Sequence, residues 1–264
     1  MFFSGPLFAN LNISNSSFPG GIAVIDFQTN YPKPEAFYNK IPLFLQQIKN
    51  NKWQIFVGIP LLAELGEKEI IVKTNSEIKI KFNVQDKHYD KEYITLTEDK
   101  KKYLNPGLSY QERIIKERKL LASARHHFSD KKLANNFFIK PINSNISSKF
   151  GNTRFTNGKA SLPHTGIDLK AAIGKPIKSS ADGKVILIGD FFFNGKSVLI
   201  DHGKGLISAY MHMQNILVKY GQQIKQGEIL GNTGDTGKVT GPHLHWSIYL
   251  NRTAINPALL LENE

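Results

Sequence analysis

The chain has 264 residues, no cysteine and a formal net charge of +12, with a pI near 9.6. This length allows two domains, and the lack of thiols excludes a disulfide framework and a thiolate metal site. The basic charge indicates an anionic partner, such as a nucleic acid, a membrane surface or an anionic wall polymer. No apolar run reaches the roughly 18 residues of a membrane-spanning helix, so no transmembrane segment is predicted.

The first part of the chain consists of short β-prone runs separated by turn residues. The apolar start, residues 1–9, lacks a basic region, so no complete signal peptide is visible. Residues 77–84 alternate polar and apolar side chains strictly, as a half-buried strand does. Several short strands at this spacing predict a small β-sandwich over residues 18–98, with His88 as a solvated surface residue. The other predicted strands are residues 20–27, 41–45, 53–59 and 69–73.

A helix is predicted after the breaker at residues 105–107. Ser109 and Glu112 have the spacing of a capping box, which places this helix at about residues 110–129. Its basic face is interpreted as solvated, and the segment 107–131 is interpreted as a link between two domains. One apolar stripe is formed by Ile114, Leu121, Ala124 and Phe128.

From residue 137 the pattern of strands and turns returns. Residues 185–188 are continuously apolar, which predicts a strand buried on both faces. Asn194 and Gly195 stand between two β-prone runs, as the residues of a two-residue hairpin turn do. Residues 231–239 fail the phosphate-loop pattern, so the late glycines are assigned to turns.

Five of the eight histidines fall between positions 164 and 245. His243 and His245 stand two apart in a β-prone run, so their side chains should share one face of a strand. Catalytic zinc sites use three protein ligands and keep the fourth position open, and His164, Asp168 and His245 would supply such a set. Residues four apart on a straight strand lie about 13 Å apart. His164 and Asp168 therefore need a bend between them, which Gly166 would provide.

Other candidates have plainer interpretations. His202 is expected to be structural or to support a ligand by hydrogen bonding, and Trp246 is expected in the core. His212 lies in an apolar run and, taken alone, would be a hydrogen-bonded core histidine. Arg154 is a candidate to hold a substrate carboxylate, and the paired His126 and His127 are expected at the surface.

These motifs form ordered blocks along the chain: Pro163-His164-Thr165-Gly166-Ile167-Asp168, Gly174-Lys175-Pro176-Ile177, Gly183-Lys184-Val185, Ile200-Asp201-His202-Gly203, Tyr210-Met211-His212 and Gly241-Pro242-His243-Leu244-His245-Trp246. With them, residues 137–260 resemble the catalytic domain of lysostaphin-type (LytM-domain) zinc metalloendopeptidases, which cut peptide cross-links in peptidoglycan. Residues 58–61, after Trp53, resemble the amino-terminal β-domain of some Gram-negative members. The fold class implied is mainly β: a small sandwich-like domain at 18–98, a linking helix at 107–131 and a β-rich LytM-type domain at 137–264.

The resemblance implies one zinc ion per chain, bound by His164, Asp168 and His245, with His212 and His243 as the catalytic pair. A zinc-bound water has a pKa lowered to about 7 and becomes a usable nucleophile. Imidazoles suit the proton transfers that peptide hydrolysis needs near neutral pH. Which of the two histidines is the base is not assigned.

The function implied is hydrolysis of peptide cross-links or stems of peptidoglycan, in the periplasm or elsewhere in the cell envelope or outside the cell. D-alanyl-diaminopimelate cross-links, glycyl bridges and uncross-linked stems are all open as the bond cleaved. The alternative is a non-catalytic wall-binding or activator protein on the same scaffold, because some relatives have lost ligands. Nucleic-acid binding is not predicted, since the chain carries no helix-turn-helix, zinc-finger or RNA-recognition signature.

Overall fold

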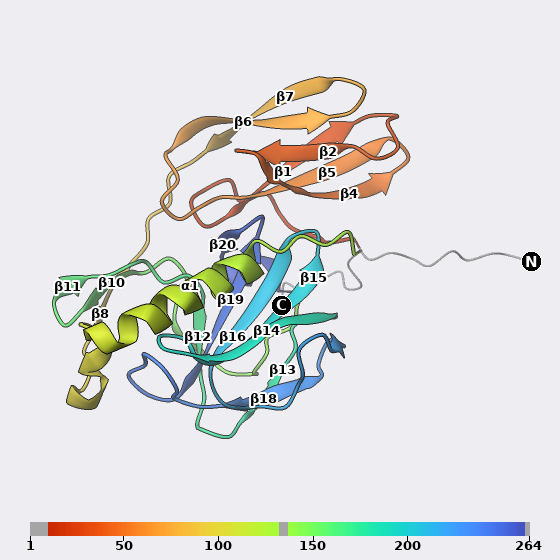
Figure 1. Ribbon diagram of the computed structural model, residues 1–264. Coiled ribbons are helices and arrows are strands. Elements are labelled where there is room, and N and C mark those ends of the chain that lie inside the picture. Colours follow the sequence, from red (N-terminus) through yellow and green to blue (C-terminus); the bar gives the residue numbers. More distant parts are fainter. Residues whose placement is uncertain (1–9, 132–136, 262–264) are drawn as a thin grey trace, which may run out of the picture.

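The computed structural model describes residues 10–131 and 137–261, and the apolar segment 1–9 lies outside these ranges. Strands dominate, and Figure 1 shows a β-domain from the first part of the chain above a larger β-domain from the second part. The mainly β fold predicted from the sequence is confirmed, whereas the predicted domain limits stay predictions. In the two ranges, no helix has the length and apolar character needed to cross a membrane.

The amino-terminal domain is a sandwich of two antiparallel sheets. One sheet has the order β1 (Ile22–Gln28), β5 (Lys52–Gly58), β4 (Phe44–Lys49), and the other has the order β3 (Ile41–Pro42), β2 (Glu35–Tyr38), β6 (Gly66–Lys73), β7 (Glu77–Val84). The alternation in β7 turns one set of its side chains toward the other sheet. The apolar core between the sheets contains Ala23, Ala36, Leu43, Ile55, Val57, Ile59, Ile70, Val72 and Val84.

The carboxy-terminal domain is built on one large sheet. Its main path has the order β17 (Gln223–Ile224), β14 (Gly183–Phe191), β15 (Gly195–Gly203), β16 (Leu206–Ile216), β19 (His243–Leu250), β12 (Ile167–Lys170), β9 (Ile146–Ser148). Further strands join this sheet: β13 (Pro176–Lys178), β18 (Ile229–Thr233) and β20 (Thr253–Ile255). A separate small sheet contains β8 (Lys91–Ile94), β10 (Thr153–Thr156) and β11 (Lys159–Ala160).

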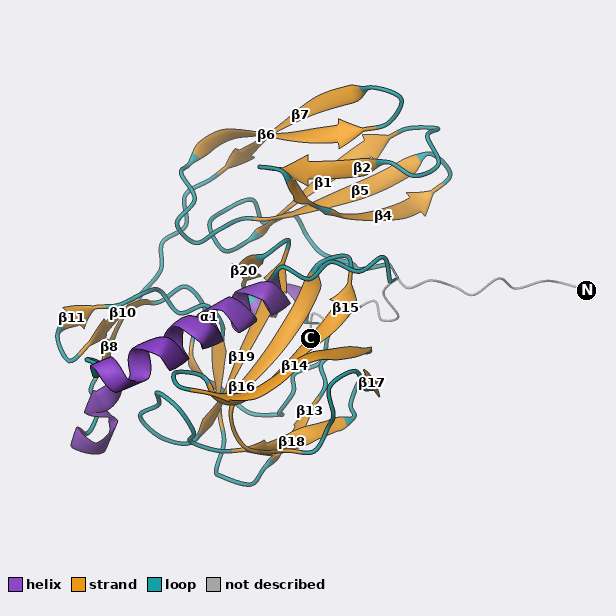
Figure 2. Cartoon of the chain, in the orientation of Figure 1, coloured by secondary structure: helices purple, strands orange, loops and turns teal. Residues whose placement is uncertain are grey.

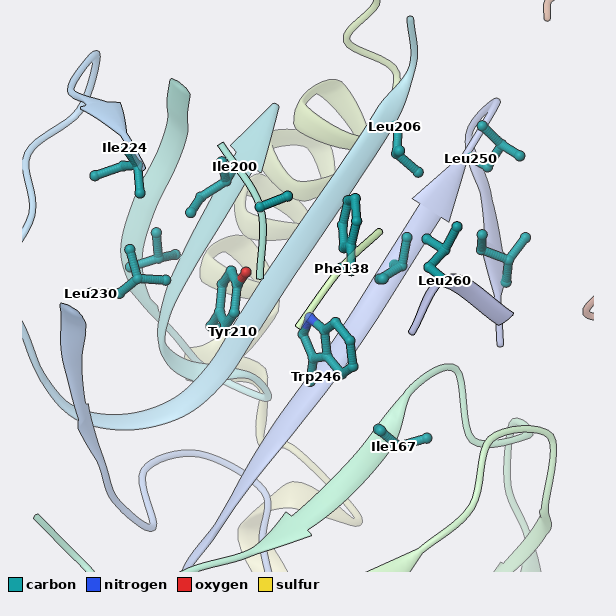
Figure 3. Close-up of a cluster of buried hydrophobic side chains, with 14 of the residues drawn as sticks. Phe138, Ile167, Ile200, Leu206, Tyr210, Ile224, Leu230, Trp246, Leu250 and Leu260 are labelled. Atoms are coloured by element: carbon teal, nitrogen blue, oxygen red, sulfur yellow. The ribbon is translucent and has the colours of Figure 1, made fainter. Parts of the chain in front are cut away.

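Both faces of the large sheet are covered. On one face, Trp246 and Tyr210 project from β19 and β16 and pack near Phe138, and all three side chains are almost fully buried (Figure 3). On the other face lies the helix α1 (Gln111–Arg125), drawn in purple across the sheet in Figure 2. Leu121 and Ala124 of this helix pack with apolar side chains of β14, β15, β16 and β19. The helix is therefore part of the carboxy-terminal core and not a free connector.

Three local expectations were wrong. The short turn η2 (Leu108–Tyr110) precedes α1, so Ser109 does not cap it, and the helix ends at Arg125, before Phe128. The hairpin loop has three residues, because Phe191 pairs with Gly195 and the left-handed φ of +60° is at Gly195. Residues 185–188 are not buried throughout, since only Val185 is fully buried.

The two β-domains meet where the end of β5 lies against the end of β19. The Gly58 amide at the end of β5 donates a hydrogen bond of 3.2 Å to Oδ1 of Asn251, which follows β19. A Cβ at position 58 would lie 2.6 Å from the Leu250 carbonyl oxygen, so only glycine allows this approach. The sandwich therefore contacts the end of β19 opposite to His243.

His202 of β15 is a structural residue, as predicted from its position. Its side chain is buried, its Nδ1 donates to the Asp182 carbonyl at 2.7 Å, and its Nε2 is 2.8 Å from the Ser208 hydroxyl. Burial lowers its pKa from 6.5 to about 4, so the ring is neutral in the folded chain at neutral pH.

This burial predicts a loss of stability in mild acid. Unfolded histidine has a pKa of about 6.5, so between that pH and the folded pKa of about 4 the unfolded chain binds more protons. Its free energy of unfolding must then fall as the pH falls. We expect urea unfolding of His202→Gln, with chelator present, to depend less on pH than that of the wild type over this window. Trp246 fluorescence in a Trp53→Phe background reports the domain, and equal pH slopes would contradict the assignment.

Candidate metal and catalytic site

The register of two paired strands builds the centre of the site. Strands β12 and β19 are antiparallel, and Asp168 lies directly opposite His245. Side chains at directly opposed positions have Cβ atoms about 4.5–5.5 Å apart. Accordingly, Asp168 Oδ1 lies 2.8 Å from His245 Nδ1, with both residues buried.

His164 reaches the same point from outside the sheet. The chain bends at Gly166 before β12 begins, and His164 Nε2 lies 3.0 Å from Asp168 Oδ1 and 3.0 Å from His245 Nδ1. The predicted bend is present, but Gly166 does not have a left-handed φ. Glycine is needed there because a Cβ would lie 2.5 Å from the Trp246 carbonyl oxygen and 2.7 Å from His245 Nε2.

Each of the two rings has a hydrogen-bond partner on its outer side. His164 Nδ1 lies 2.8 Å from the Lys149 carbonyl, which can only accept, so Nδ1 carries the proton and Nε2 keeps its lone pair. His245 Nε2 lies 2.8 Å from the Ser247 hydroxyl, which can accept its proton. Two nitrogen lone pairs and one carboxylate oxygen thus face one another.

His243 and His212 lie beside this group. His243 is on the same strand face as His245, and its Nε2 is 3.7 Å from Asp168 Oδ1. The His212 ring centroid lies 5.1 Å from that of His243 and 6.0 Å from that of His245. Both rings use Nδ1 to donate to a backbone carbonyl, His243 to Gly241 at 2.9 Å and His212 to Thr236 at 2.8 Å. Each Nε2 lone pair is therefore available.

His212 reaches this position through an irregular backbone. Its φ is +63°, in the left-handed region that residues other than glycine rarely adopt. The pairing of β16 with β15 shifts register beside it, and its amide donates to the Asn194 carbonyl of the hairpin loop at 3.0 Å. A register shift of this kind redirects a side chain. The apolar run around His212 predicts a strand but contains no signal for this shift.

Burial and neighbouring groups set the charge of the site. Burial raises the pKa of the Asp168 carboxyl, but the adjoining imidazoles of His164 and His245 hold it well below its usual range. Burial lowers the pKa of His245 to about 4. Burial and the nearby His243 lower the pKa of His212 well below its usual value. At neutral pH the site therefore contains the Asp168 carboxylate and the neutral imidazoles of His212 and His245, which suits a cation.

Arg154 does not have the role expected from the sequence. Its guanidinium donates from Nη2 to Asp168 Oδ2 at 2.7 Å and from Nε to Glu92 Oε2 at 2.8 Å. It is therefore engaged with the site's own carboxylate. Ser148 and Glu92 were not singled out in the sequence, because neither belongs to a recognisable motif. The other three histidines, His88, His126 and His127, are exposed as expected.

The chain is similar over almost its whole length to a known structure. A crystal structure described as a peptidase M23 from Pseudomonas aeruginosa has 36% sequence identity and a TM-score of 0.79, covering 94% of this chain and 96% of that chain. The chain belongs to peptidase family M23. Residues 162–257 match Peptidase family M23, and residues 15–87 match the Peptidase family M23 N-terminal domain.

Two curated relatives of this M23 chain carry informative names. A protein of Buchnera aphidicola subsp. Baizongia pistaciae, named as an uncharacterized metalloprotease, is 44% identical over 121 residues, which are 45% of this chain and 32% of that protein. Peptidoglycan DD-endopeptidase ShyA of Vibrio cholerae is 38% identical over 119 residues, which are 44% of this chain and 28% of that protein. The matches thus span less than a third of either relative.

The close packing at Gly166 leads to a stability prediction. Gly166→Ala places a Cβ against backbone and a ring that cannot move freely, and overpacking of this kind costs about 1–3 kcal/mol. We expect that loss in the free energy of unfolding followed by urea and Trp246 fluorescence. Gly107→Ala is the matched control, because only the Ser109 hydroxyl oxygen, at 3.9 Å, lies near its added Cβ. Equal stability of the two variants would contradict the packing argument.

Proposed function

We propose that this M23 chain is a zinc-dependent endopeptidase that hydrolyses peptide bonds in the cross-links or stems of bacterial peptidoglycan. The convergence of His164 Nε2, Asp168 Oδ1 and His245 Nδ1 carries this proposal. The name of the Vibrio cholerae relative supports peptidoglycan as the substrate. Action on peptidoglycan in turn supports a location in the periplasm or elsewhere in the cell envelope.

The three converging atoms fit a zinc ion. Without a shared positive charge between them, two nitrogen lone pairs and a carboxylate oxygen 2.8–3.0 Å apart repel one another. Ligand atoms at about 2.0–2.2 Å from a tetrahedral zinc lie about 3.3 Å from each other, close to these separations. Two histidines and one carboxylate form the type of donor set that catalytic zinc sites use, with one position open. We therefore assign His164, Asp168 and His245 as the ligands of one zinc per chain.

When bound, zinc supplies a Lewis acid that polarises the scissile carbonyl and acidifies water. The hydrogen bonds of His164 to Lys149 and of His245 to Ser247 hold these two rings in the tautomer that directs a lone pair inward. Burial of His164, Asp168 and His245 excludes bulk water from the ligands, which strengthens their electrostatic interactions.

His212 and His243 supply the proton transfers. Both are held by Nδ1–H bonds to backbone carbonyls, so Nε2 of each ring accepts a proton and the resulting imidazolium donates one. Leu244 separates His243 from His245, so the motif offers no glutamate for this task. We assign both histidines to the reaction without dividing base from oxyanion donor between them.

The alternative is a non-catalytic wall-binding or activator protein. Such a protein would not need a complete set of metal ligands and catalytic histidines. The complete set of five residues, brought together with consistent tautomers, favours the enzyme. Among the possible bonds, the DD-endopeptidase names of the relatives from Vibrio cholerae favour the D-alanyl-diaminopimelate cross-link.

The first test combines metal content with product analysis. Protein purified without chelator should carry about one zinc per chain and should release cross-link or stem fragments from purified peptidoglycan, identified by mass spectrometry. His164→Ala, Asp168→Ala and His245→Ala should lose both zinc and hydrolysis, because two remaining ligands are too few. A wild type that binds zinc but releases no peptide would support the activator alternative. Full zinc content and activity in any of the three variants would remove that residue from the ligand set.

The second test separates the catalytic pair from the ligands. His212→Ala and His243→Ala should keep about one zinc per chain, since neither fills a ligand position. Their turnover should fall by about 10²- to 10⁴-fold, the usual contribution of general acid–base groups. Zinc stoichiometry and turnover should be measured on the same preparations. A metal-free variant would reassign that histidine as a ligand, and wild-type turnover would make it a bystander.

A further inference from the structure

The strand β8 brings an acidic residue from the segment between the two β-domains to the edge of the site. β8 pairs in parallel with β10, and Glu92 stands opposite Arg154 in this register. Glu92 lies outside both stretches that match the family, residues 15–87 and residues 162–257. Its side chain is 23% exposed, and it points toward the site while its neighbour Tyr93 is exposed.

Glu92 belongs to a network of hydrogen bonds that includes a proposed zinc ligand. Its Oε2 accepts from Arg154 Nε at 2.8 Å and from the Ser148 hydroxyl at 2.9 Å. Arg154 Nη2 donates to the Ser148 oxygen at 3.0 Å and to Asp168 Oδ2 at 2.7 Å. Ser148 Oγ is also 3.1 Å from His164 Nδ1. The network therefore touches two of the three converging residues.

We propose that Glu92 is a positioning residue for the metal centre, acting through Arg154 on Asp168. This inference rests on the proposed function, because it assumes that His164, Asp168 and His245 hold zinc. Glu92 fixes the guanidinium so that it binds Oδ2 of Asp168 and leaves Oδ1 facing the two imidazoles. One carboxylate oxygen is thereby reserved for the metal and the other for the arginine.

The charges of Arg154 and Glu92 also support the role proposed for Glu92. Arg154 places one positive charge against a carboxylate that must bind a cation, which opposes zinc binding. Glu92 places one negative charge on the same guanidinium and offsets that effect. Removal of the Glu92 charge leaves the centre more positive by one unit and frees Arg154 to engage both oxygens of Asp168. Both consequences weaken binding of a divalent cation.

The test is zinc affinity, measured by competition with a chromogenic chelator. Residues that orient metal ligands typically change metal affinity by about 10- to 100-fold when mutated, and we expect a loss in this range for Glu92→Gln. Asp90→Asn is the matched control, because it removes an exposed carboxylate, 66% accessible, two positions away on the same segment. This control should bind zinc as the wild type does. The urea unfolding midpoint of each metal-free variant shows whether the fold is intact.

A double-mutant cycle tests whether Glu92 acts through Arg154. In an Arg154→Gln background, Glu92→Gln should change zinc affinity little. Glu92→Asp keeps the charge and should bind zinc more tightly than Glu92→Gln. If Glu92→Gln fails to fold, the zinc affinity of Glu92→Asp still tests the role of the charge. Wild-type zinc affinity in Glu92→Gln, or an equal loss in both backgrounds, overturns the inference and leaves the zinc site standing. A wild-type chain that binds no zinc overturns the proposed function and this inference together.

Discussion

The antiparallel register of β12 against β19 is the constraint on which the site depends. It sets Asp168 opposite His245, so their side chains meet on one face of the sheet. A shift of β12 by one residue would turn Asp168 to the face of the sheet opposite His245. The register is secured by the apolar residues between and beside them, since Leu169, Leu244 and Trp246 are fully buried. The same strand register therefore packs these apolar side chains and aligns Asp168 with His245.

Two departures from regular strand geometry complete the site. The bend at Gly166 brings His164 to Asp168 and His245, and the backbone of β19 leaves no room for a Cβ at position 166. The left-handed φ at His212 turns that ring toward His243 and away from the apolar packing of β16. Such conformations persist when surrounding contacts determine them. At His212 the contacts are one backbone hydrogen bond to Asn194 and one side-chain hydrogen bond to the Thr236 carbonyl.

The ionic contacts of Asp168 extend to residues outside the sequence motifs of the catalytic domain. The pair Arg154 and Glu92 links Asp168 to a strand contributed by the segment between the two β-domains. The same segment carries Tyr89, whose hydroxyl donates to the Pro19 carbonyl at 2.6 Å. One stretch of chain thus joins the amino-terminal sandwich to the edge of the candidate site. The sandwich itself contacts the far end of β19, away from His243.

The sequence by itself determined the mainly β class, most strands of the amino-terminal domain, the longest strands of the carboxy-terminal sheet and the identity of the histidines and aspartate that the fold brings together. It could do so because strand periodicity and motif spacing are local properties of the chain. Tertiary structure alone decided the turn of His212 and the position of Glu92. Each of these depends on a partner distant in sequence, the Thr236 carbonyl for His212 and Arg154 on β10 for Glu92. The local sequence pattern does not identify such partners. An isolated segment would adopt several conformations, and packing against a remote segment selects one of them.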